Sequence, residues 1–145
     1  MPRAKGPSAG RRGWAMLNVR IKTIPHDFQE YATVGNYWRD ADECGGATLE
    51  IRVSRMRDRR HEFLVALHEL IEAFLCEWRQ IPFARITRFD IEYEINRRKG
   101  QSEEPGASVR APYRREHRFA ERVERIVARE LGVDWQEYDR AIARL

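Results

Sequence analysis

The stretch that decides the fold is FLVALHELIEAFLC, which runs from Phe63 to Cys76. It is interrupted by only three polar residues, His68, Glu69 and Glu72. Apolar side chains point in nearly every direction around a helix of this sequence, so we expect a buried helix. Ionisable groups in such a helix are costly unless they are paired or bind a cation. The same stretch therefore marks both the core and a candidate site.

The three polar residues have the spacing of metal ligands on a helix. His68 and Glu72 lie one turn apart on one face, and Glu69 lies to the side. The pattern His-Glu-x-x-Glu differs from the common metalloprotease pattern His-Glu-x-x-His at its last position. Imidazole nitrogen and carboxylate oxygen both bind zinc, and a catalytic zinc normally has three protein ligands and a water. His68 and Glu72 therefore need a third ligand.

His117 is the leading candidate for that third ligand. The helix in which it lies has an apolar arc made of Phe119, Val123, Ile126, Val127 and Leu131. His117 falls at the edge of this arc and faces the boundary of the core. A zinc ion held by His68, Glu72 and His117 would lower the pKa of a bound water towards ~7. Glu69 would then take the proton of this water as a general base.

Simpler interpretations remain open for these residues. His68 and Glu72 can form a buried hydrogen-bonded pair that fixes helix packing, while Glu69 meets an arginine. His117 can bond to Glu121 one turn later. His61 lies two turns before His68 on the same face, but at the helix start we expect a surface or capping residue and not a ligand. His26 follows Pro25 in a loop and carries no pattern.

The first half of the chain predicts strands and then the central helix. Leu17, Val19 and Ile21 alternate with polar residues, which indicates a half-buried strand that ends near Pro25. Tyr37-Trp38, the polar turn 40–46 and the alternating residues 49–54 indicate a hairpin whose second strand leads into the helix. Asp58 is the expected N-cap, and the helix should run to about Arg79 because Pro82 follows.

The second half predicts helices joined by a loop. The segment 86–97 alternates like a strand, but Thr87 and Asp90 resemble a helix-start capping pair, and we favour a helix. Residues 99–111 are rich in loop signals. Pro112 is expected at the first position of the next helix and Gly132 just after its end. A capping pattern of Asp134 and Glu137 predicts a last short helix.

Composition limits the class of protein. A chain of 145 residues with 42% hydrophobic content fits one domain, which we place at residues 14–145 after a mobile basic tail at 1–13. The expected fold class is α+β, with a small antiparallel or mixed sheet packed on the metal-site helix and further helices. The net charge of +4 and the pI near 9.4 come from arginines interleaved with acidic residues, a pattern that allows nucleic-acid binding without indicating it.

Cysteine usage and targeting signals point to a cytoplasmic protein. Cys44 and Cys76 indicate no disulfide framework, and Cys76 should pack as a small hydrophobic residue. The N-terminus lacks the apolar core of a signal peptide, and no segment is long enough to span a bilayer. We therefore expect a cytoplasmic location and no membrane partner; the oligomeric state is not predicted.

Several short motifs together carry a resemblance. They are His68-Glu69-Leu70 with Glu72, Phe89-Asp90, Tyr93-Glu94, Glu104-Pro105-Gly106, Pro112-Tyr113, Glu116-His117, Phe119-Ala120 and residues 130–135. In this set the chain resembles short, uncharacterised bacterial and phage proteins that are similar to minimal zincin-type metallopeptidases, over about Tyr31 to Tyr138. The resemblance implies a zincin-like metallohydrolase domain but no established substrate, and a peptide or protein is the candidate that we consider. It also implies that the strand 49–53 is the sheet edge at the active cleft, where an extended peptide could pair.

Two other functions compete with a zinc hydrolase. Glu69, Glu72, Asp90, Glu94 and Glu116 could form a carboxylate cluster for Mg²⁺ or Mn²⁺, as in all-helical nucleotide pyrophosphatases, although the expected strands argue against such a fold. Asp90 and Glu94 could instead orient the histidines, bind a cation themselves, or be surface carboxylates. The chain could also be a non-enzymatic module whose basic tail and arginine-rich surface bind nucleic acid or a partner.

Overall fold

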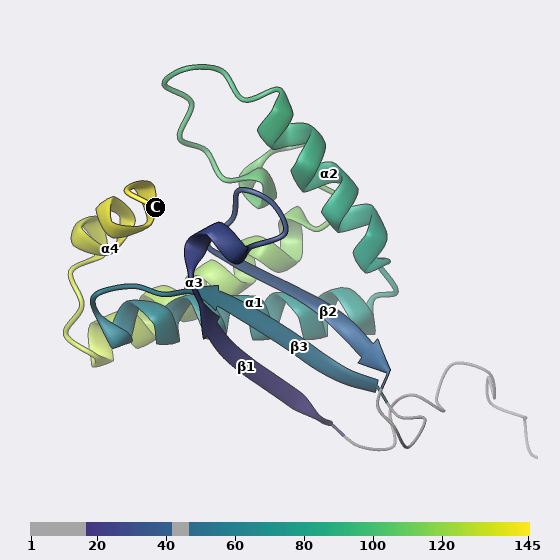
Figure 1. Cartoon of the computed structure of the whole chain (residues 1–145), viewed down its shortest axis with the longest axis horizontal. Helices are drawn as coiled ribbons and strands as arrows, with labels where there is room; N and C mark the ends of the chain where they lie inside the picture. The colour runs from purple at the N-terminus through teal and green to yellow at the C-terminus, as the bar shows by residue number, and fades with distance from the viewer. Residues whose placement is uncertain (1–16, 42–46) are drawn as a thin grey trace, which may run out of the picture.

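The chain folds into an α+β arrangement of a small mixed sheet and helices (Figure 1). A computed structural model describes residues 17–41 and 47–145. The strands are β1 (Val19–Ile24), β2 (Gly35–Ala41) and β3 (Ala47–Ser54), and the α-helices are α1 (Arg59–Trp78), α2 (Phe83–Ile95), α3 (Arg114–Glu130) and α4 (Trp135–Ala143), with 3-10 turns η1 (His26–Phe28) and η2 (Pro105–Ala107). The tail at 1–13, Cys44 and most of the expected turn 40–46 lie outside the described residues. No helix in the described part is long and apolar enough to cross a membrane.

The sheet has the strand order β1-β3-β2. β2 and β3 form the predicted hairpin, with Tyr37 opposite Ile51, and β1 pairs with β3 in the parallel direction. β3 is therefore hydrogen-bonded on both sides. The expectation that residues 49–53 form the sheet edge is wrong, because β1 occupies that side. The edge strand that lies next to α2 is β2 (Figure 1).

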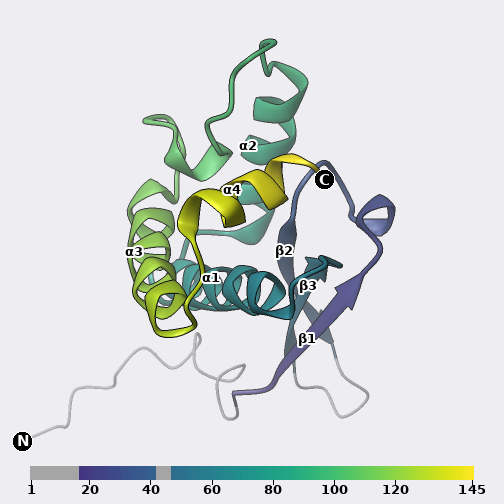
Figure 2. The same cartoon turned by 90° about the vertical axis from the view of Figure 1, so that its left-hand side faces the viewer.

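The predicted strand 49–54 is confirmed as part of β3, but all residues of β3 except Ala47 and Arg52 are buried. Leu49, Ile51 and Val53 are fully buried in the core. On the other face Glu50 is also buried, with basic side chains from β1 and β3 within 4 Å of its carboxylate. β1 is a strand as expected, but it is mostly exposed, and the exposed fraction of Ile21 is 48%. β1 is exposed because it lies at the sheet edge remote from α2 and α3 (Figure 2).

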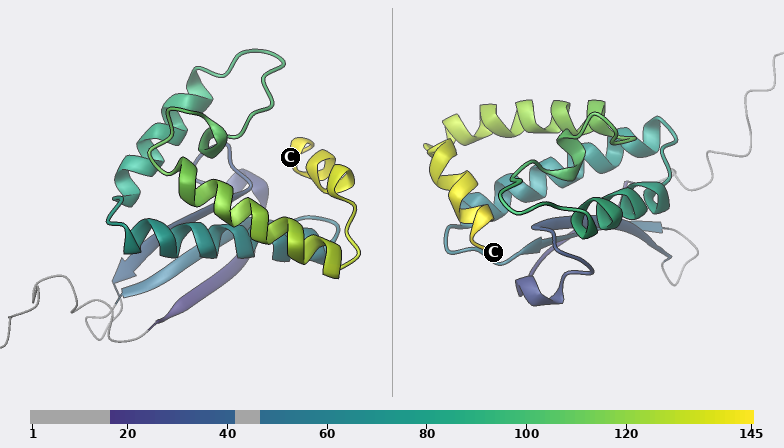
Figure 3. Two further views of the ribbon diagram at one scale, coloured as in Figure 1. Left: turned by 180° about the vertical axis from the view of Figure 1, so that it is seen from behind. Right: turned by 90° about the horizontal axis from the view of Figure 1, so that it is seen from above.

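α1 lies between the sheet and α3, so it has packed neighbours on opposite sides (Figure 2 and the right view of Figure 3). This arrangement explains why the helix is apolar in so many directions. Its predicted limits are confirmed, since the Asp58 side chain accepts a hydrogen bond from the Arg60 N–H and Arg79 is the C-cap. Complete burial is not found: Phe63 and Trp78 have exposed fractions of 53% and 70%.

The helical interpretation of the segment after Pro82 is confirmed, but its start was predicted wrongly. α2 begins at Phe83 directly after Pro82, which places Thr87 and Asp90 inside the helix instead of at its cap. Similarly, α3 begins at Arg114, two residues later than the start expected from Pro112. In both cases the helix start depends on how the preceding turn packs, which a local proline or capping signal does not show.

The end of α3 and the last helix agree with the sequence. Gly132 has a positive φ of 64°, which suits a glycine after a helix end. The Asp134 side chain accepts a hydrogen bond from the Glu137 N–H at 2.8 Å and caps α4.

The buried face of α3 differs from the predicted apolar arc. The buried residues are Glu116, His117, Ala120, Glu124 and Ala128. Phe119 and Ile126, which belong to the predicted arc, have exposed fractions of 43% and 58%. α3 therefore turns small and ionisable side chains inward. The alanines fit beside α1, and the ionisable residues require partners inside the molecule.

Candidate metal centre

The three residues singled out as ligands meet inside the molecule. α1 supplies His68 and Glu72, and α3 supplies His117. His68 Nε2 lies 3.2 Å from Glu72 Oε2 and 3.1 Å from His117 Nδ1, and His117 Nδ1 lies 2.8 Å from Glu72 Oε2. All three side chains are buried, and one ligand atom from each could hold the same metal ion.

His68 is fixed through its other ring nitrogen. Its Nδ1 lies 2.7 Å from Glu124 Oε2, and the second oxygen of Glu124 accepts a hydrogen bond from the Tyr138 hydroxyl. Glu124 and Tyr138 are both buried. A chain of hydrogen bonds therefore runs from α4 through α3 to His68, and it fixes the ring so that Nε2 faces Glu72 and His117.

His117 is fixed from the loop before α3. Its Nε2 lies 3.1 Å from Glu104 Oε2, and this carboxylate belongs to a side chain with an exposed fraction of 54%. The backbone of Gly106 passes so close that a Cβ there would lie 2.4 Å from His117 Nδ1. The Tyr113 ring meets the histidine edge-on, with centroids 6.2 Å apart. These contacts turn Nδ1 towards the other two candidate ligands.

With both rings neutral, the hydrogen bonds to Glu124 and Glu104 would leave three acceptors facing one another. If each neutral ring donates its one N–H to its carboxylate partner, His68 Nε2 and His117 Nδ1 present lone pairs to Glu72 Oε2. The other oxygen of Glu72 accepts a hydrogen bond from the Tyr37 hydroxyl at 2.9 Å. Three lone pairs at such distances repel one another unless positive charge, from a metal ion or from protons on the rings, lies between them.

The geometry suits a zinc ion with a small adjustment. Bonds of about 2.0–2.2 Å in a tetrahedron separate ligand atoms by about 3.3–3.6 Å. The observed separations of 2.8 to 3.2 Å are a few tenths of an ångström shorter. Small side-chain rotations would provide the difference. Two histidines and one glutamate are also one of the ligand sets of catalytic zinc sites.

The electrostatics of the cluster also favour a positive charge. Burial by itself would lower the pKa of His68, but hydrogen bonds to Glu124 and Glu72 raise it well above its ordinary value. Burial opposes protonation of His117 too, yet Glu104 and Glu72 raise its pKa to about 9. Burial would raise the pKa of Glu72, and its hydrogen bonds to the two histidines lower it instead. The surrounding carboxylates thus stabilise a cation at this position, whether protons or a metal ion.

Glu69 borders the cluster without joining it. Its side chain lies against β2, where a Cβ at Gly35 would be 2.7 Å from Glu69 Oε1. Burial and the neighbouring Glu72 carboxylate raise the pKa of Glu69. Within the described part of the chain Glu69 makes no ion pair with an arginine, so that alternative is wrong.

The proposed carboxylate cluster is not assembled. Glu94 pairs with Arg97 at 2.7 Å, and Glu116 pairs with Arg79 at 2.7 Å. Asp90 accepts hydrogen bonds from two tyrosine hydroxyls, those of Tyr31 and Tyr113. Neither Asp90 nor Glu94 bonds to a histidine, so the expectation that they orient the rings directly is wrong.

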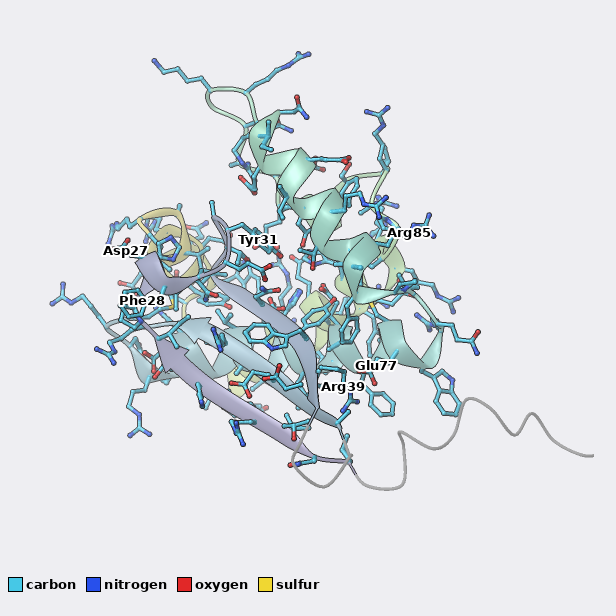
Figure 4. The ribbon with its side chains drawn as sticks, turned by 45° about the vertical axis from the view of Figure 1, so that its right-hand side comes forward. Asp27, Phe28, Tyr31, Arg39, Glu77 and Arg85 are labelled. Atoms are coloured by element: carbon cyan, nitrogen blue, oxygen red, sulfur yellow. The ribbon has the colours of Figure 1, made fainter. Side chains whose placement is uncertain are left out.

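Asp90 nevertheless links two tyrosines beside the cluster, Tyr31 and Tyr113. Tyr31 comes from the loop before β2 and points towards the space between the sheet and α2 (Figure 4). It donates a hydrogen bond at 3.0 Å to Asp90. Burial raises the pKa of the Asp90 carboxyl to about 7. Tyr113 joins the same carboxylate to the ring of His117.

The alternatives for the other histidines are resolved by their contacts. His117 does not bond to Glu121, which pairs with Arg125 at 2.8 Å instead. His61 lies near the helix start, where it approaches Asp58 and packs beside the Tyr138 ring. His26 contacts the Ser54 hydroxyl at 2.9 Å and is not one of the residues that meet in the cluster.

Sequence reasoning missed four side chains that support the candidate ligands: Tyr37, Glu104, Glu124 and Tyr138. Glu124 follows His117 by seven residues, which is two helical turns on the same face, and this spacing could have identified it. Glu104 belongs to one of the motifs quoted for the resemblance, but no spacing connects it to His117. Tyr37 and Tyr138 gave no local signal, because each acts across a tertiary contact.

Comparisons with protein-family models, curated proteins and solved structures find no match for this chain. Function must therefore be argued from the site itself.

Proposed function

We propose that this chain is a zinc-dependent hydrolase that acts on peptide bonds in a zincin-like manner. The observation that carries the proposal is the convergence of His68 Nε2, His117 Nδ1 and Glu72 Oε2 while the second nitrogen of each ring is held by a carboxylate. Metal-binding histidines almost always donate their other N–H to such a partner. A histidine–glutamate pair that only fixes packing does not require the second histidine or its carboxylate.

The donor set favours zinc over magnesium. Magnesium prefers six oxygen ligands, whereas this cluster offers two imidazole nitrogens and one carboxylate. The sequence has Glu72 where the common pattern has its second histidine, and His117 from α3 supplies the missing imidazole. Bound in such a set, zinc lowers the pKa of a coordinated water and polarises a carbonyl group.

Glu69 is the residue that we propose as the general base. It follows His68 directly on α1, and its carboxylate lies beside the cluster against Gly35 of β2. Its raised pKa brings proton transfer closer to neutral pH, which suits a group that accepts and returns a proton.

The edge of the sheet offers a place for an extended substrate. β2 is an edge strand, and a groove of about 770 Å³ runs between it and α2. The groove lining includes the aromatic side chains Tyr37, Trp38 and Phe83. Tyr37 connects the groove with the cluster, because it lines the groove and its hydroxyl donates a hydrogen bond to Glu72. We propose that a peptide pairs with β2 and places its scissile bond near Glu69.

Metal analysis of the purified protein tests the proposal. The wild-type protein should contain near-stoichiometric zinc without added metal, and His68→Ala should lose both zinc and turnover of a peptide library. Glu69→Gln should retain zinc and lose turnover, because only the proton acceptor is removed. His26→Ala is a matched control on a histidine outside the cluster, and it should retain both.

Two results would count against the proposal. The first is background zinc in the wild type, with neither bound metal nor peptide turnover appearing when Zn²⁺ or Mn²⁺ is added. The cluster would then be a hydrogen-bonded structural element. Equal turnover by Glu69→Gln and wild-type protein would remove Glu69 from the mechanism while leaving metal binding intact.

A further inference from the structure

α3 carries a line of arginines on its outward face. We define the arginine ridge as Arg115, Arg118, Arg122, Arg125 and Arg129, all of which are exposed. Their spacing of three and four residues places them on one side of the helix, over about 21 Å at 1.5 Å per residue. Seen from behind, α3 is the outermost element, and no other described element covers this side (left view of Figure 3).

We propose that the arginine ridge binds the phosphate backbone of duplex DNA. This inference does not depend on the proposed hydrolase activity, because the ridge and the candidate ligand His117 lie on opposite faces of α3. Arginine is the preferred residue for phosphate contacts, since its planar guanidinium presents several donors in a fixed geometry.

The acidic residues of α3 neutralise this face only in part, since Glu121 and the exposed Glu130 are the two glutamates of α3 that are not buried. Glu116 and Glu124 are buried, where they bond to Arg79 and to His68. Of the ridge residues, Arg125 pairs with Glu121. Within residues 17–41 and 47–145, the other four have no ion pair, and three of them (Arg115, Arg118 and Arg129) also have no aromatic contact.

The outside of the molecule is more basic than its net charge of +4 suggests. Five carboxylates are buried, namely Glu50, Glu72, Asp90, Glu116 and Glu124, whereas no lysine or arginine of the described residues is buried. Of the 27 basic residues in the chain, 24 are arginines. An outward face with positive charge in excess fits a polyanion.

Aromatic contacts hold two members of the ridge in place. The guanidinium of Arg122 lies 5.4 Å from the centre of the Phe119 ring, and that of Arg125 lies 4.2 Å from the Trp135 ring. Such contacts reduce the entropy lost when the arginines bind phosphate. A straight row of charges without free stacking platforms fits the duplex backbone better than unpaired bases, which require aromatic stacking.

The experiment measures duplex DNA binding by the full chain as a function of salt concentration. For phosphate contacts by three to five ridge arginines, log K should fall with log salt with a slope of about −2.7 to −4.5. The triple variant Arg115→Gln, Arg118→Gln, Arg129→Gln removes the three unpartnered arginines and keeps good helix propensity. Its slope should be shallower by about 0.9 for each phosphate that is no longer neutralised, and its affinity at low salt should fall more than about tenfold.

A matched control removes the same charge elsewhere. Arg85, Arg88 and Arg98 are exposed on α2 and just beyond it, and Figure 4 labels Arg85 on that helix. The variant with glutamine at these three positions should keep most of the wild-type salt slope. Both variants should keep the wild-type far-UV circular dichroism spectrum and the wild-type midpoint of denaturant unfolding, which verifies that the fold is intact.

Four outcomes would overturn the inference. These are absence of salt-dependent binding by the wild type, equal losses in the ridge and control variants, loss of binding only when residues 1–12 are deleted, and tighter binding to vesicles of anionic phospholipid than to DNA. The second outcome would show a general effect of net charge. The last would assign the ridge to a membrane surface.

Discussion

The two histidines of the candidate site are supported in different ways. His68 lies in the middle of α1, and its partner Glu124 is buried and held in turn by Tyr138. His117 lies in the first turn of α3, and its partner Glu104 belongs to a loop and is about half exposed. A buried carboxylate is weakly screened, whereas an exposed one competes with water and salt. The half of the site around His68 should therefore be rigid, and the half around His117 adjustable.

The largest loss of zinc affinity is expected for Gly106→Ala, which tests whether the backbone at Gly106 positions His117. In Gly106→Ala the new Cβ would lie 2.4 Å from His117 Cγ and Nδ1, so the ring or the loop must move. Zinc affinity should fall more than about 100-fold, beyond the 10–100-fold loss typical when only a partner of a ligand is changed. Overpacking should also reduce the free energy of unfolding by about 1–3 kcal/mol. Competition with a chromophoric chelator and denaturant unfolding measure the two quantities.

Gly132→Ala separates ligand displacement from loss of stability. Gly132 has a φ of 64°, so alanine there is strained, but no atom lies within 4 Å of its new Cβ. This variant should lose about 1–2 kcal/mol of stability and keep wild-type zinc affinity. If Gly106→Ala also binds zinc like the wild type, the backbone at Gly106 does not position His117.

The next effect tests the rigid half of the site. Glu124→Gln keeps the size of the side chain but removes the charge that accepts the His68 Nδ1–H. Zinc should bind about 10–100-fold more weakly, as found when partners of metal-binding histidines are changed. Glu121→Gln on the same helix is the control, because Glu121 pairs with the exposed Arg125 and not with a histidine. Similar zinc affinity in both variants would mean that Glu124 does not support the metal site.

The smallest loss of zinc affinity is expected in the half of the site around His117. Glu104→Gln should weaken zinc binding less than about tenfold, since its side chain is 54% exposed and water can take the place of the carboxylate oxygen beside His117. The difference from wild type should shrink as salt is added. Zinc titrations of both proteins at two ionic strengths measure this difference in affinity. A loss of affinity as large as that of Glu124→Gln would erase the proposed difference between the two histidines.

The sequence predicted well those features that depend on local chemistry. The limits of α1 follow from the Asp58 cap and Pro82, and the hairpin of β2 and β3 follows from alternation around a polar turn. His68 and Glu72 were identifiable because polar residues stand out in an apolar helix. His117 was chosen for its place at the edge of an apolar arc, but it lies inside a buried face of α3. His117 meets His68 and Glu72 as expected, but it does not lie at the edge of an apolar arc.

Features that depend on partners distant in sequence were not predicted. β1 pairs with β3 and moves the sheet edge to β2, and no local pattern in residues 49–53 reveals a neighbour about 30 residues away. The buried face of α3 was misread because its polar residues are inward-facing. A carboxylate such as Glu124 is tolerated inside only because His68 and Tyr138 arrive from other helices.

The sequence by itself determined the elements and one half of the candidate site, because helix caps, turns and residue spacing act within a few residues. The tertiary structure decided which acceptors face one another, which carboxylates are buried and which arginines are left outside. Burying a charge is unfavourable until a partner from another element compensates for it. The cost and its compensation lie in different parts of the chain, and only folding brings them together.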